Sequence, residues 1–183
     1  PIYSDDVLSD ENENLLNQLL MRNRQVYTDS LTKVFNRRYC DERLRRLSGE
    51  YALAMIDIDN LKQINDCLGH PAGDTAIYHT AQAIRAILRS QDELVRYGGD
   101  EFLLLFHSLP QNILRRKLED ICRAVRALRV ADLPELRITV SIGGVYAAGQ
   151  ISELVEKADL ALYRAKAQKD SAVLYEEDFH DSE

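Results

Sequence analysis

The sequence predicts an α/β or α+β fold with a central mixed sheet of about five strands, flanked by helices and preceded by an N-terminal helix. Two observations support this prediction. Short apolar segments typical of buried strands alternate with longer segments whose apolar residues recur at helical spacing. Two of the strand segments are separated only by Gly98-Gly99-Asp100, which indicates a hairpin.

The N-terminal segment, residues 1–27, is predicted to contain a signalling or linker helix over residues 5–27. It carries one apolar stripe, made of Leu8, Leu15, Leu16, Leu19, Leu20 and Val26. The stripe is too short to establish a coiled coil. Two interpretations therefore stay open: a helix that pairs with its twin in a dimer, and a helix that packs on its own domain.

The main domain is expected over residues 28–178, followed by an acidic tail, 179–183, that frays. Its first helix can be capped by Thr32 or Asn36, runs to about Leu47 and stops at Ser48-Gly49. The segment YALAMIDID, residues 51–59, is apolar until its aspartates, as expected of a strand buried on both faces.

Alternating elements continue to the end of the domain. The apolar spacing predicts further helices over about 60–68, 72–89, 114–128 and 152–168. Runs of β-branched and other apolar residues predict further strands over 93–97, 101–106, 137–147 and 172–175.

Composition and charge limit the possible functions. Of the 183 residues, 45% are hydrophobic and 29% are charged, as in an ordinary folded domain. The net charge of −7 argues against nucleic acid as a partner, because that requires a basic surface. A nucleotide substrate remains compatible with this charge, since metal ions can mediate between carboxylates and phosphates.

The sequence also bears on compartment. Cys40, Cys67 and Cys122 are isolated, which fits small half-buried side chains in a reducing compartment better than disulfides or a zinc site. There is no run of about 18 apolar residues, and the acidic N-terminus lacks the apolar core of a signal peptide. We therefore expect a cytoplasmic domain, and a membrane tether in the full-length protein stays open.

Two acidic pairs are the main candidates for chemistry. Asp57 and Asp59 lie two apart on one strand and point to the same side, while Asp100 and Glu101 lie in the hairpin. If the hairpin lies beside strand 51–59, three or four carboxylates converge. Such an oxygen-only set favours Mg²⁺ or Mn²⁺, and Mg²⁺ held by few carboxylates usually carries substrate phosphates. Taken singly, each pair is a weak signal and is better explained as solvated turn acids.

The paired glycines admit two interpretations. Gly98 and Gly99 can supply positive φ for a tight turn, or can let a base or phosphate approach the backbone closely. Other nucleotide and nucleophile motifs are missing, since the sequence has no GxxxxGK[ST] loop and no nucleophile elbow.

Six spaced motifs resemble one family. RYGGDEF at 96–102 looks like the signature of GGDEF-domain diguanylate cyclases, and the resemblance covers about Thr28 to Tyr175. The other matching motifs, in family order, are DSLTKVFNRR (29–38), DIDNLKQIND (57–66), GHPAGD (69–74), VSIGG (140–144) and ADLALYRAK (158–166).

This resemblance implies a palm-like nucleotidyl-cyclase fold and an enzyme that condenses two GTP molecules into cyclic di-GMP with release of two pyrophosphates. It further implies a homodimer with one GTP per subunit, Mg²⁺ or Mn²⁺ as cofactor, and a sensor domain before the N-terminal helix.

The resemblance also implies roles for individual residues. Asp57, the backbone of Ile58, Asp100 and Glu101 would bind metal, and Asp100, Glu101 and Lys62 would be catalytic. Asn65 and Asp74 would read guanine. The remaining substrate contacts would come from Asn60, Leu61, Lys62, Gly98, Gly99 and Lys166.

Ordinary structural roles compete with these assignments. Lys62 and Asp66 have the spacing of a helix ion pair, and Lys166 could be a surface lysine. Asn65 could cap a turn, and Asp74 could begin a helix.

Arg89-Ser90-Gln91-Asp92 matches the family's RxxD inhibitory motif, at which Arg89 and Asp92 would bind cyclic di-GMP. An arginine fork suits a phosphate or guanine edge. The alternative is a helix-end arginine followed by an aspartate in the next turn.

Three departures from the family pattern stand out. Lys33-Val34 replaces Gly-Leu, Leu61 replaces Phe, and Asp170 stands where a phosphate-contacting Arg is usual. A carboxylate near a triphosphate is unfavourable, although Lys169 could compensate. The leading interpretation is an active cyclase. The alternatives are a weak or inactive module that binds cyclic di-GMP or GTP, and a dimeric scaffold built on the N-terminal helix.

Overall fold

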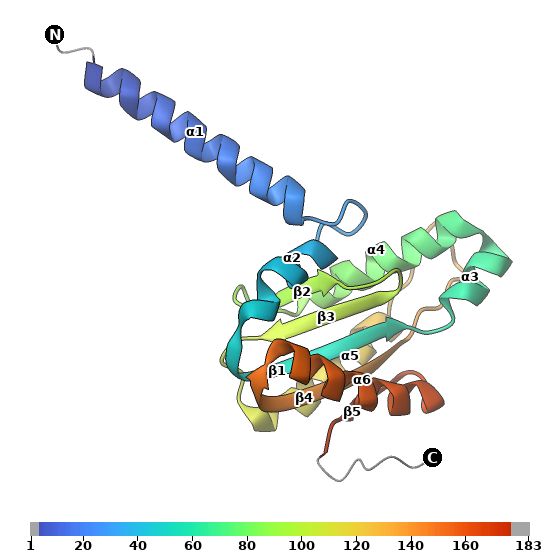
Figure 1. Ribbon diagram of the computed structural model, residues 1–183. Helices are drawn as coiled ribbons and strands as arrows, with labels where there is room; N and C mark the ends of the chain where they lie inside the picture. Colours follow the sequence, from blue (N-terminus) through green and yellow to red (C-terminus); the bar gives the residue numbers. More distant parts are fainter. Residues whose placement is uncertain (1–3, 177–183) are drawn as a thin grey trace.

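The computed structural model describes residues 4–176 as one five-stranded sheet covered by helices on both faces, with one helix projecting away from it (Figure 1). The strand order is β2-β3-β1-β4-β5. The central strand β1 (Ser48–Ile58) is antiparallel to both neighbours, β3 (Glu101–Phe106) and β4 (Val140–Gln150). The edge strand β2 (Glu93–Arg96) is antiparallel to β3, and β5 (Ser171–Leu174) is parallel to β4. The predicted mixed five-stranded sheet is therefore confirmed.

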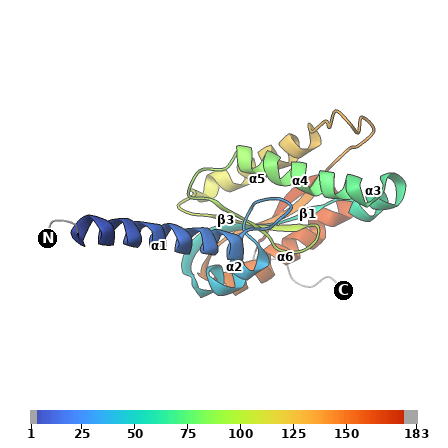
Figure 2. The ribbon, with the colours of Figure 1, turned by 90° about the horizontal axis from the view of Figure 1, so that it is seen from above.

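Two layers of helices enclose the sheet, as the view from above in Figure 2 makes plain. The first layer contains α3 (Leu61–Leu68), α4 (His70–Ala86) and α5 (Gln111–Arg126). On the opposite face lie α2 (Arg37–Glu42) and α6 (Ile151–Gln168). Alternate residues of β1 enter separate cores: Ala54, Ile56 and Ile58 face α4 and α5, whereas Leu53 and Met55 face α6.

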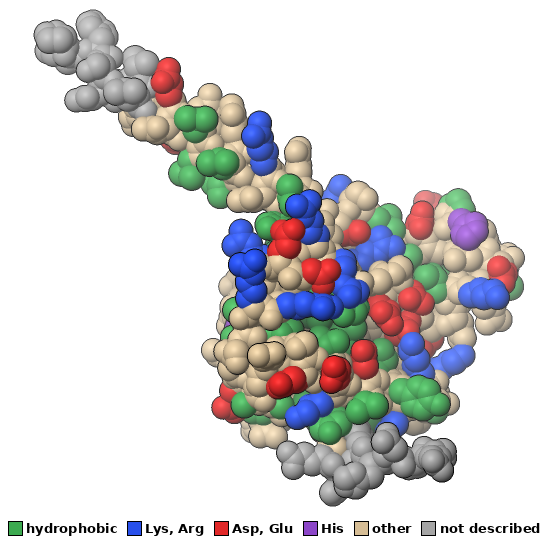
Figure 3. All heavy atoms as spheres, in the orientation of Figure 1, with side chains coloured by type: hydrophobic (Ala, Val, Ile, Leu, Met, Phe, Trp, Pro, Cys, Tyr) green, Lys and Arg blue, Asp and Glu red, His purple; other side chains and the backbone are tan. Residues whose placement is uncertain are grey.

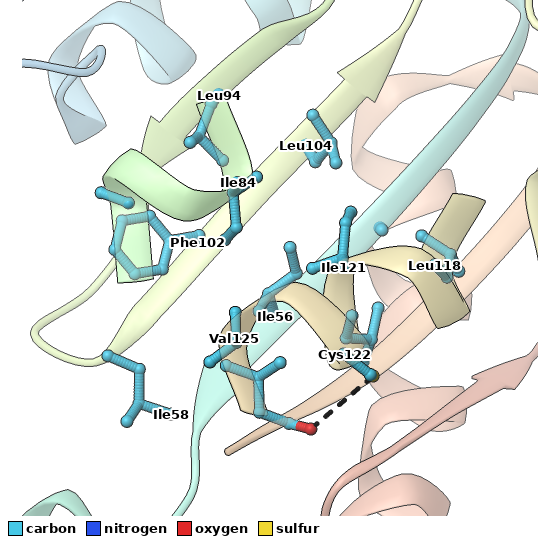
Figure 4. Packing of buried hydrophobic residues seen from close by; sticks show 14 of the residues in the cluster. Ile56, Ile58, Ile84, Leu94, Phe102, Leu104, Leu118, Ile121, Cys122 and Val125 are labelled. Carbon is cyan, nitrogen blue, oxygen red and sulfur yellow. Dashed lines mark hydrogen bonds between the residues drawn. The ribbon is translucent and has the colours of Figure 1, made fainter. Parts of the chain in front are cut away.

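The core on the α4 and α5 side is the larger one (Figure 4). Ile56, Phe102 and Leu104 of the sheet pack there against Ile84 of α4 and Ile121 of α5, and all five are fully buried. On the other side, Gly143 lets α6 lie directly on the sheet, because an added Cβ would come 2.1 Å from the carbonyl oxygen of Ala158. This close approach fixes α6, and with it Lys166, relative to the end of β1.

The predicted helix ending at Leu47 is wrong in extent. Asn36 does cap α2 by accepting a hydrogen bond of 3.0 Å from the Tyr39 amide, but α2 ends at Glu42 and a short 3₁₀ turn, η1 (Leu44–Arg46), follows. Ser48-Gly49 does not stop a helix. These residues begin β1, because they pair with Gln150 and Gly149 of β4. For the same reason β4 ends later than predicted, at Gln150, and it also begins later, at Val140 rather than at residue 137.

The N-terminal helix α1 (Ser4–Tyr27) projects from the domain, so the interpretation in which it packs on its own domain does not hold (Figures 1 and 3). Six apolar side chains between residues 15 and 26 are exposed, from 37% at Val26 to 67% at Met21. Its C-terminal end is anchored, since the Tyr27 hydroxyl donates to Glu42 at 2.8 Å and the Asn36 side chain donates to the Val26 carbonyl at 2.8 Å.

Two further expectations can be compared with the structure. Cys40 and Cys122 are buried, whereas Cys67 is exposed rather than half-buried, and all three thiols are free. None of the helices within residues 4–176 combines the length and the apolar character needed to cross a bilayer. The predicted tail, 179–183, lies outside the described residues.

Candidate functional site

The tight turn between β2 and β3 lies against the end of β1, which was the condition for the acidic pairs to meet. The Ile58 amide donates to the Asp100 carbonyl at 3.0 Å, and Asp57 lies directly opposite Glu101 in the β1–β3 ladder. The turn closes through the amides of Tyr97 and Gly98, which both donate to the Glu101 carbonyl, at 2.8 and 3.2 Å. Asp57, Asp100 and Glu101 therefore share one edge of the sheet.

The two glycines of this turn are not used for positive φ, because neither has a left-handed backbone. An added Cβ at Gly98 would come 3.2 Å from Glu101 Oε2, whereas at Gly99 it would meet nothing within 4 Å. Gly98 therefore gives room to the Glu101 carboxylate, and Gly99 leaves open space beside Asp100. This favours the interpretation in which the glycines admit a ligand close to the backbone.

Arg96 and Asp29 hold this turn in place, a role that sequence reasoning missed. Arg96 donates to the Gly99 carbonyl at 2.9 Å and pairs with Asp29 at 3.3 Å. Asp29 also accepts from the amide and hydroxyl of Thr32, at 2.9 and 2.7 Å. Burial raises the Asp29 pKa, but the hydrogen bonds from Thr32 and the Arg96 charge outweigh it and leave the pKa lowered. The motif DSLT thus supports the turn.

A cavity of about 260 Å³ opens at this edge. Its walls bring together most of the predicted metal and phosphate residues: Asp57, Ile58, Asp59, Asn60, Leu61, Lys62, Asp100, Lys166 and Lys169. Small-molecule pockets usually measure roughly 300–1,000 Å³. The cavity therefore has room for part of a nucleotide, such as its phosphates, rather than for all of it.

The Asp57 carboxylate lies in an environment that disfavours its ionisation. The pKa of Asp57 is raised to about 6, mainly by burial and also by the nearby Asp100 and Glu101 carboxylates, against the opposing effect of Lys166. The Lys166 ammonium forms an ion pair with Asp57, and this pairing raises the Lys166 pKa although burial lowers it. The positive charge of Lys166 therefore partly offsets the burial and the repulsion that disfavour the ionised Asp57 carboxylate.

Asp59 has a structural role instead of joining this acidic group. Its carboxylate accepts hydrogen bonds from the Ser141 hydroxyl at 2.6 Å, the Thr139 hydroxyl at 2.7 Å and the Asp170 amide at 2.9 Å. Within residues 4–176 no three His, Cys, Asp or Glu side chains come together as a metal site. Asp57, Asp100 and Glu101 thus share the edge as expected, but they do not form a ready-made set of three metal ligands, and Asp59 does not join them.

The remaining donors nevertheless fit a hard divalent cation. The Asp57 and Asp100 carboxylates and the Ile58 carbonyl offer oxygen only, which is the ligand type that Mg²⁺ and Mn²⁺ prefer. Few protein carboxylates are sufficient where substrate phosphates complete the coordination. The raised pKa of Asp57 supports the same fit, because a cation would relieve the repulsion that raises it.

The start of α3 adds hydrogen-bond donors to the same cavity. Asn60 precedes the helix with φ 58° and gives it no side-chain cap, and Leu61 and Lys62 line the cavity. Uncapped amides at a helix N-terminus favour anions. Lys62, Lys166 and Lys169 also line this cavity, so it combines carboxylates with three basic residues.

The predicted guanine-reading residues lie on neighbouring helices. Asn65 of α3 packs on Gly73 of α4 so closely that a Cβ on Gly73 would lie 1.8 Å from Asn65 Oδ1. Asp74 is the next residue and is exposed. The pair lies beyond the cavity walls, since Asn65 and Asp74 do not line it.

Arg89 and Asp92 bind each other in this structure. Arg89 donates to Asp92 from Nε at 3.2 Å, from Nη2 at 2.8 Å and from its amide at 2.9 Å, and the Asp92 side chain is fully buried. Nη2 also donates to the His107 carbonyl at 2.8 Å. The pair lines a separate cavity of about 340 Å³ together with Lys33, Phe35 and Arg85.

Comparison with known proteins agrees with this geometry. Residues 26–172 match the family model described as "Diguanylate cyclase, GGDEF domain". The chain is 34% identical over 148 residues to the probable diguanylate cyclase DgcC of Escherichia coli, covering 75% of this chain and 40% of DgcC. It is 35% identical over 173 residues to diguanylate cyclase TpbB of Pseudomonas aeruginosa, covering 88% of this chain and 38% of TpbB. The chain thus spans about two fifths of these relatives.

Solved structures show the same fold. The coiled coil and GGDEF domain of DgcB from Caulobacter crescentus, in complex with c-di-GMP, has a TM-score of 0.81 at 29% identity, covering 92% of this chain and 96% of that one. Diguanylate cyclase SiaD of Pseudomonas aeruginosa, in complex with its activator SiaC, has a TM-score of 0.79 at 35% identity, covering 92% and 70%. The family predicted from the motifs is confirmed: the chain belongs to the GGDEF family of diguanylate cyclase domains.

Proposed function

We propose that this chain is a diguanylate cyclase that condenses two GTP molecules into cyclic di-GMP with release of two pyrophosphates. The observation that carries the proposal is the cavity at the end of β1, which Asp57 and Asp100 line together with Lys62 and Lys166, and in which Lys166 pairs with Asp57. A phosphoryl-transfer site needs this combination of metal-binding carboxylates and cations. The printed names of the relatives point to the same reaction.

The metal would be held by the Asp57 carboxylate, the Ile58 carbonyl and the Asp100 carboxylate, with Glu101 next to them. When bound, Mg²⁺ or Mn²⁺ would lower the pKa of the attacking hydroxyl and offset charge on the phosphates. Lys166 pairs with Asp57 in this structure and has an exposed side chain, so it can shift from the carboxylate to the substrate.

The chain's own groups position the triphosphate. The first amides of α3, at Leu61 and Lys62, would donate to phosphate oxygens, and the Lys62 and Lys166 ammonium groups would offset their charge. Gly98 and Gly99 leave the turn free of side chains beside the reacting phosphate. In this arrangement the 3′-hydroxyl of one GTP attacks the α-phosphate of the other, and pyrophosphate leaves. Glu101 is the candidate group for accepting the proton.

Asn65 and Asp74 would select guanine. A carboxylate accepts from N1–H and the 2-amino group of guanine, and an amide matches its acceptor atoms. The packing of Asn65 on Gly73 supports this role, because it fixes the amide one residue from Asp74. Adenine would leave these groups unpaired, which penalises ATP.

The reaction needs two GTP molecules, so we propose that two subunits bring their sites together in a homodimer. The exposed apolar stripe of α1, including Leu15, Leu16, Leu19 and Leu20, supports pairing of this helix with its twin. A sensor domain before α1 would control the pairing, in keeping with the small share of the relatives that this chain covers.

A second candidate function is a receptor that binds cyclic di-GMP or GTP without turnover. The cavity of about 340 Å³ beside Arg89 and Asp92 favours binding of cyclic di-GMP by such a receptor. In an active cyclase, we propose that the same cavity is the inhibitory site for this product. Arg89 would exchange part of its pairing with Asp92 for a phosphate or guanine edge. Incubation of the chain with GTP and Mg²⁺, followed by detection of cyclic di-GMP, separates the enzyme from the receptor.

A further inference from the structure

Lys169 and Asp170, which connect α6 to β5, direct their side chains to different parts of the molecule. Both have left-handed backbones, with φ of 59° and 44°, which is unfavourable for non-glycine residues. Hydrogen bonds hold this conformation: the Lys169 amide donates to the Ala165 carbonyl at 2.8 Å, and the Asp170 amide donates to Asp59 Oδ2 at 2.9 Å.

Lys169 faces the phosphate cavity. It lines this cavity with Lys62 and Lys166, and its ammonium donates to Asn60 Oδ1 directly before the first amides of α3. Asn60 is exposed, so the bond lies at the open side of the cavity. Its partner there is a neutral amide rather than a carboxylate, and a short movement brings the ammonium to an anion at the start of α3.

Asp170 faces away from that cavity, towards α5. Arg126 holds its carboxylate with two bonds, Nε to Oδ2 at 2.6 Å and Nη2 to Oδ1 at 3.0 Å. Together with Cys122 and Arg123, both residues line a different cavity. The pair is fairly exposed, at 51% for Arg126 and 32% for Asp170, and such pairs contribute little to stability. The main effect of the pair is therefore to fix the position of the negatively charged Asp170 carboxylate.

We propose that Lys169 is a triphosphate-binding residue and that Arg126 is a positioning residue that keeps the Asp170 carboxylate away from the phosphates. The inference rests on the proposed function, since it concerns the same GTP site. A free carboxylate at the exit of α6 would repel a triphosphate, whereas a fixed one beside a lysine leaves net positive charge on the cavity side. The apparently unfavourable Asp170 is thereby made compatible with GTP binding.

The first test is calorimetric binding of GTP and of GMP to the full chain and to Lys169→Met, Lys169→Arg and Lys157→Met, with Ca²⁺ present to limit turnover. Lys157 is a control on the same helix, where its ammonium lies over the Tyr175 ring. Loss of a charge-assisted contact should weaken GTP binding roughly tenfold or more in Lys169→Met. GMP binding should change less than threefold, and Lys169→Arg and Lys157→Met should bind GTP like the parent.

The second test uses Arg126→Leu, alone and combined with Asp170→Asn. Releasing Asp170 should weaken GTP binding about threefold to tenfold, and neutralising it in the double variant should restore the parent affinity. Arg123→Leu is the matched control, because Arg123 pairs with the exposed Asp120 at 2.7 Å on the same helix. It should leave GTP binding unchanged.

The outcomes distinguish this inference from the proposed function. If the parent binds GTP and makes cyclic di-GMP while Lys169→Met binds GTP within twofold of the parent, Lys169 is not a phosphate ligand. Equal losses for GTP and GMP would mean that Lys169 only supports the fold around Asn60. An Arg126→Leu defect that persists with Asp170→Asn would overturn the positioning role. A parent that binds no GTP would instead refute the proposed function.

Discussion

The backbone amide of Ile58 donates a 3.0 Å hydrogen bond to the carbonyl oxygen of Asp100, and this bond joins the end of β1 to the turn between β2 and β3. Two motifs that are distant in sequence are fixed against each other by main-chain atoms alone. Asp57 and Asp100 consequently line one cavity, although their negatively charged carboxylates repel each other. Burial and repulsion at this position raise the pKa of Asp57 to about 6.

A first prediction concerns metal binding and stability. Because the folded-state pKa of Asp57 is raised from 3.8 to about 6, its ionisation lowers the stability of the fold progressively between these two pH values, and the full loss persists at pH 7. Asp57→Asn should therefore stabilise the metal-free chain at pH 7, by about 1–2 kcal/mol. Addition of GTP and Mg²⁺ should raise the Tm of the parent but not of the variant. Calorimetric melting of both forms measures this, and a Tm increase of equal size in Asp57→Asn would remove Asp57 from the metal site.

A second prediction uses Gly73, on which Asn65 packs. In Gly73→Ala the new Cβ would lie 1.8 Å from Asn65 Oδ1, so the flexible Asn65 side chain must move. Alanine suits a helix interior better than glycine by roughly 0.5–1 kcal/mol, so the Tm should hold or rise. GTP binding should weaken about tenfold, because the guanine edge loses its partner. Calorimetry with GTP and ATP tests this, and unchanged GTP affinity in a folded variant would show that Asn65 does not read the base.

The acidic edge could be predicted from sequence because two short patterns carry it. DID ends an apolar strand, GDE forms a turn, and ladder pairing then brings Asp57 opposite Glu101. The part played by Asp59 could not be predicted. Its partners Thr139 and Ser141 come from a segment about 80 residues later, and nothing in either pattern shows that they meet.

Backbone conformation explains the other differences. The helix expected up to Leu47 ends at Glu42 and is followed by a 3₁₀ turn, whereas Ser48 and Gly49, expected to stop it, adopt an extended conformation because they pair with β4. Lys169 and Asp170 diverge because two consecutive residues have positive φ without any glycine, and the bonds that stabilise this come from Ala165 and Asp59. Local sequence gives no sign of either feature.

A third prediction concerns Arg89 and Asp92. Arg89→Ala should weaken binding of cyclic di-GMP by roughly 1.5–3 kcal/mol, through loss of a charge-assisted fork. It should also lower the free energy of unfolding by about 1–3 kcal/mol. The substitution removes both side-chain bonds to the buried Asp92 carboxylate and leaves the bond from the main-chain amide of residue 89. Calorimetric binding and chemical denaturation measure the two effects. Basal synthesis should survive, and undiminished product binding and inhibition would leave this RxxD sequence a structural pair only.

A fourth prediction concerns α1. Leu16 and Leu20 are 56% and 52% exposed, so Leu16→Gln with Leu20→Gln should leave the Tm of the chain nearly unchanged. If α1 pairs with its twin, the variant should dimerise more weakly and lose specific activity at low protein concentration. Sedimentation and rate measurements over a dilution series test this. Identical dimerisation of parent and variant would place the subunit contact elsewhere.

The most direct measurement is a chromatographic assay of the purified full chain incubated with GTP and Mg²⁺. The proposed function predicts cyclic di-GMP and two pyrophosphates for each product molecule, a rate per chain that rises with protein concentration, and no product from Asp100→Asn that remains folded. GTP that binds yet stays unconverted over hours at high protein concentration, with either Mg²⁺ or Mn²⁺, would contradict it.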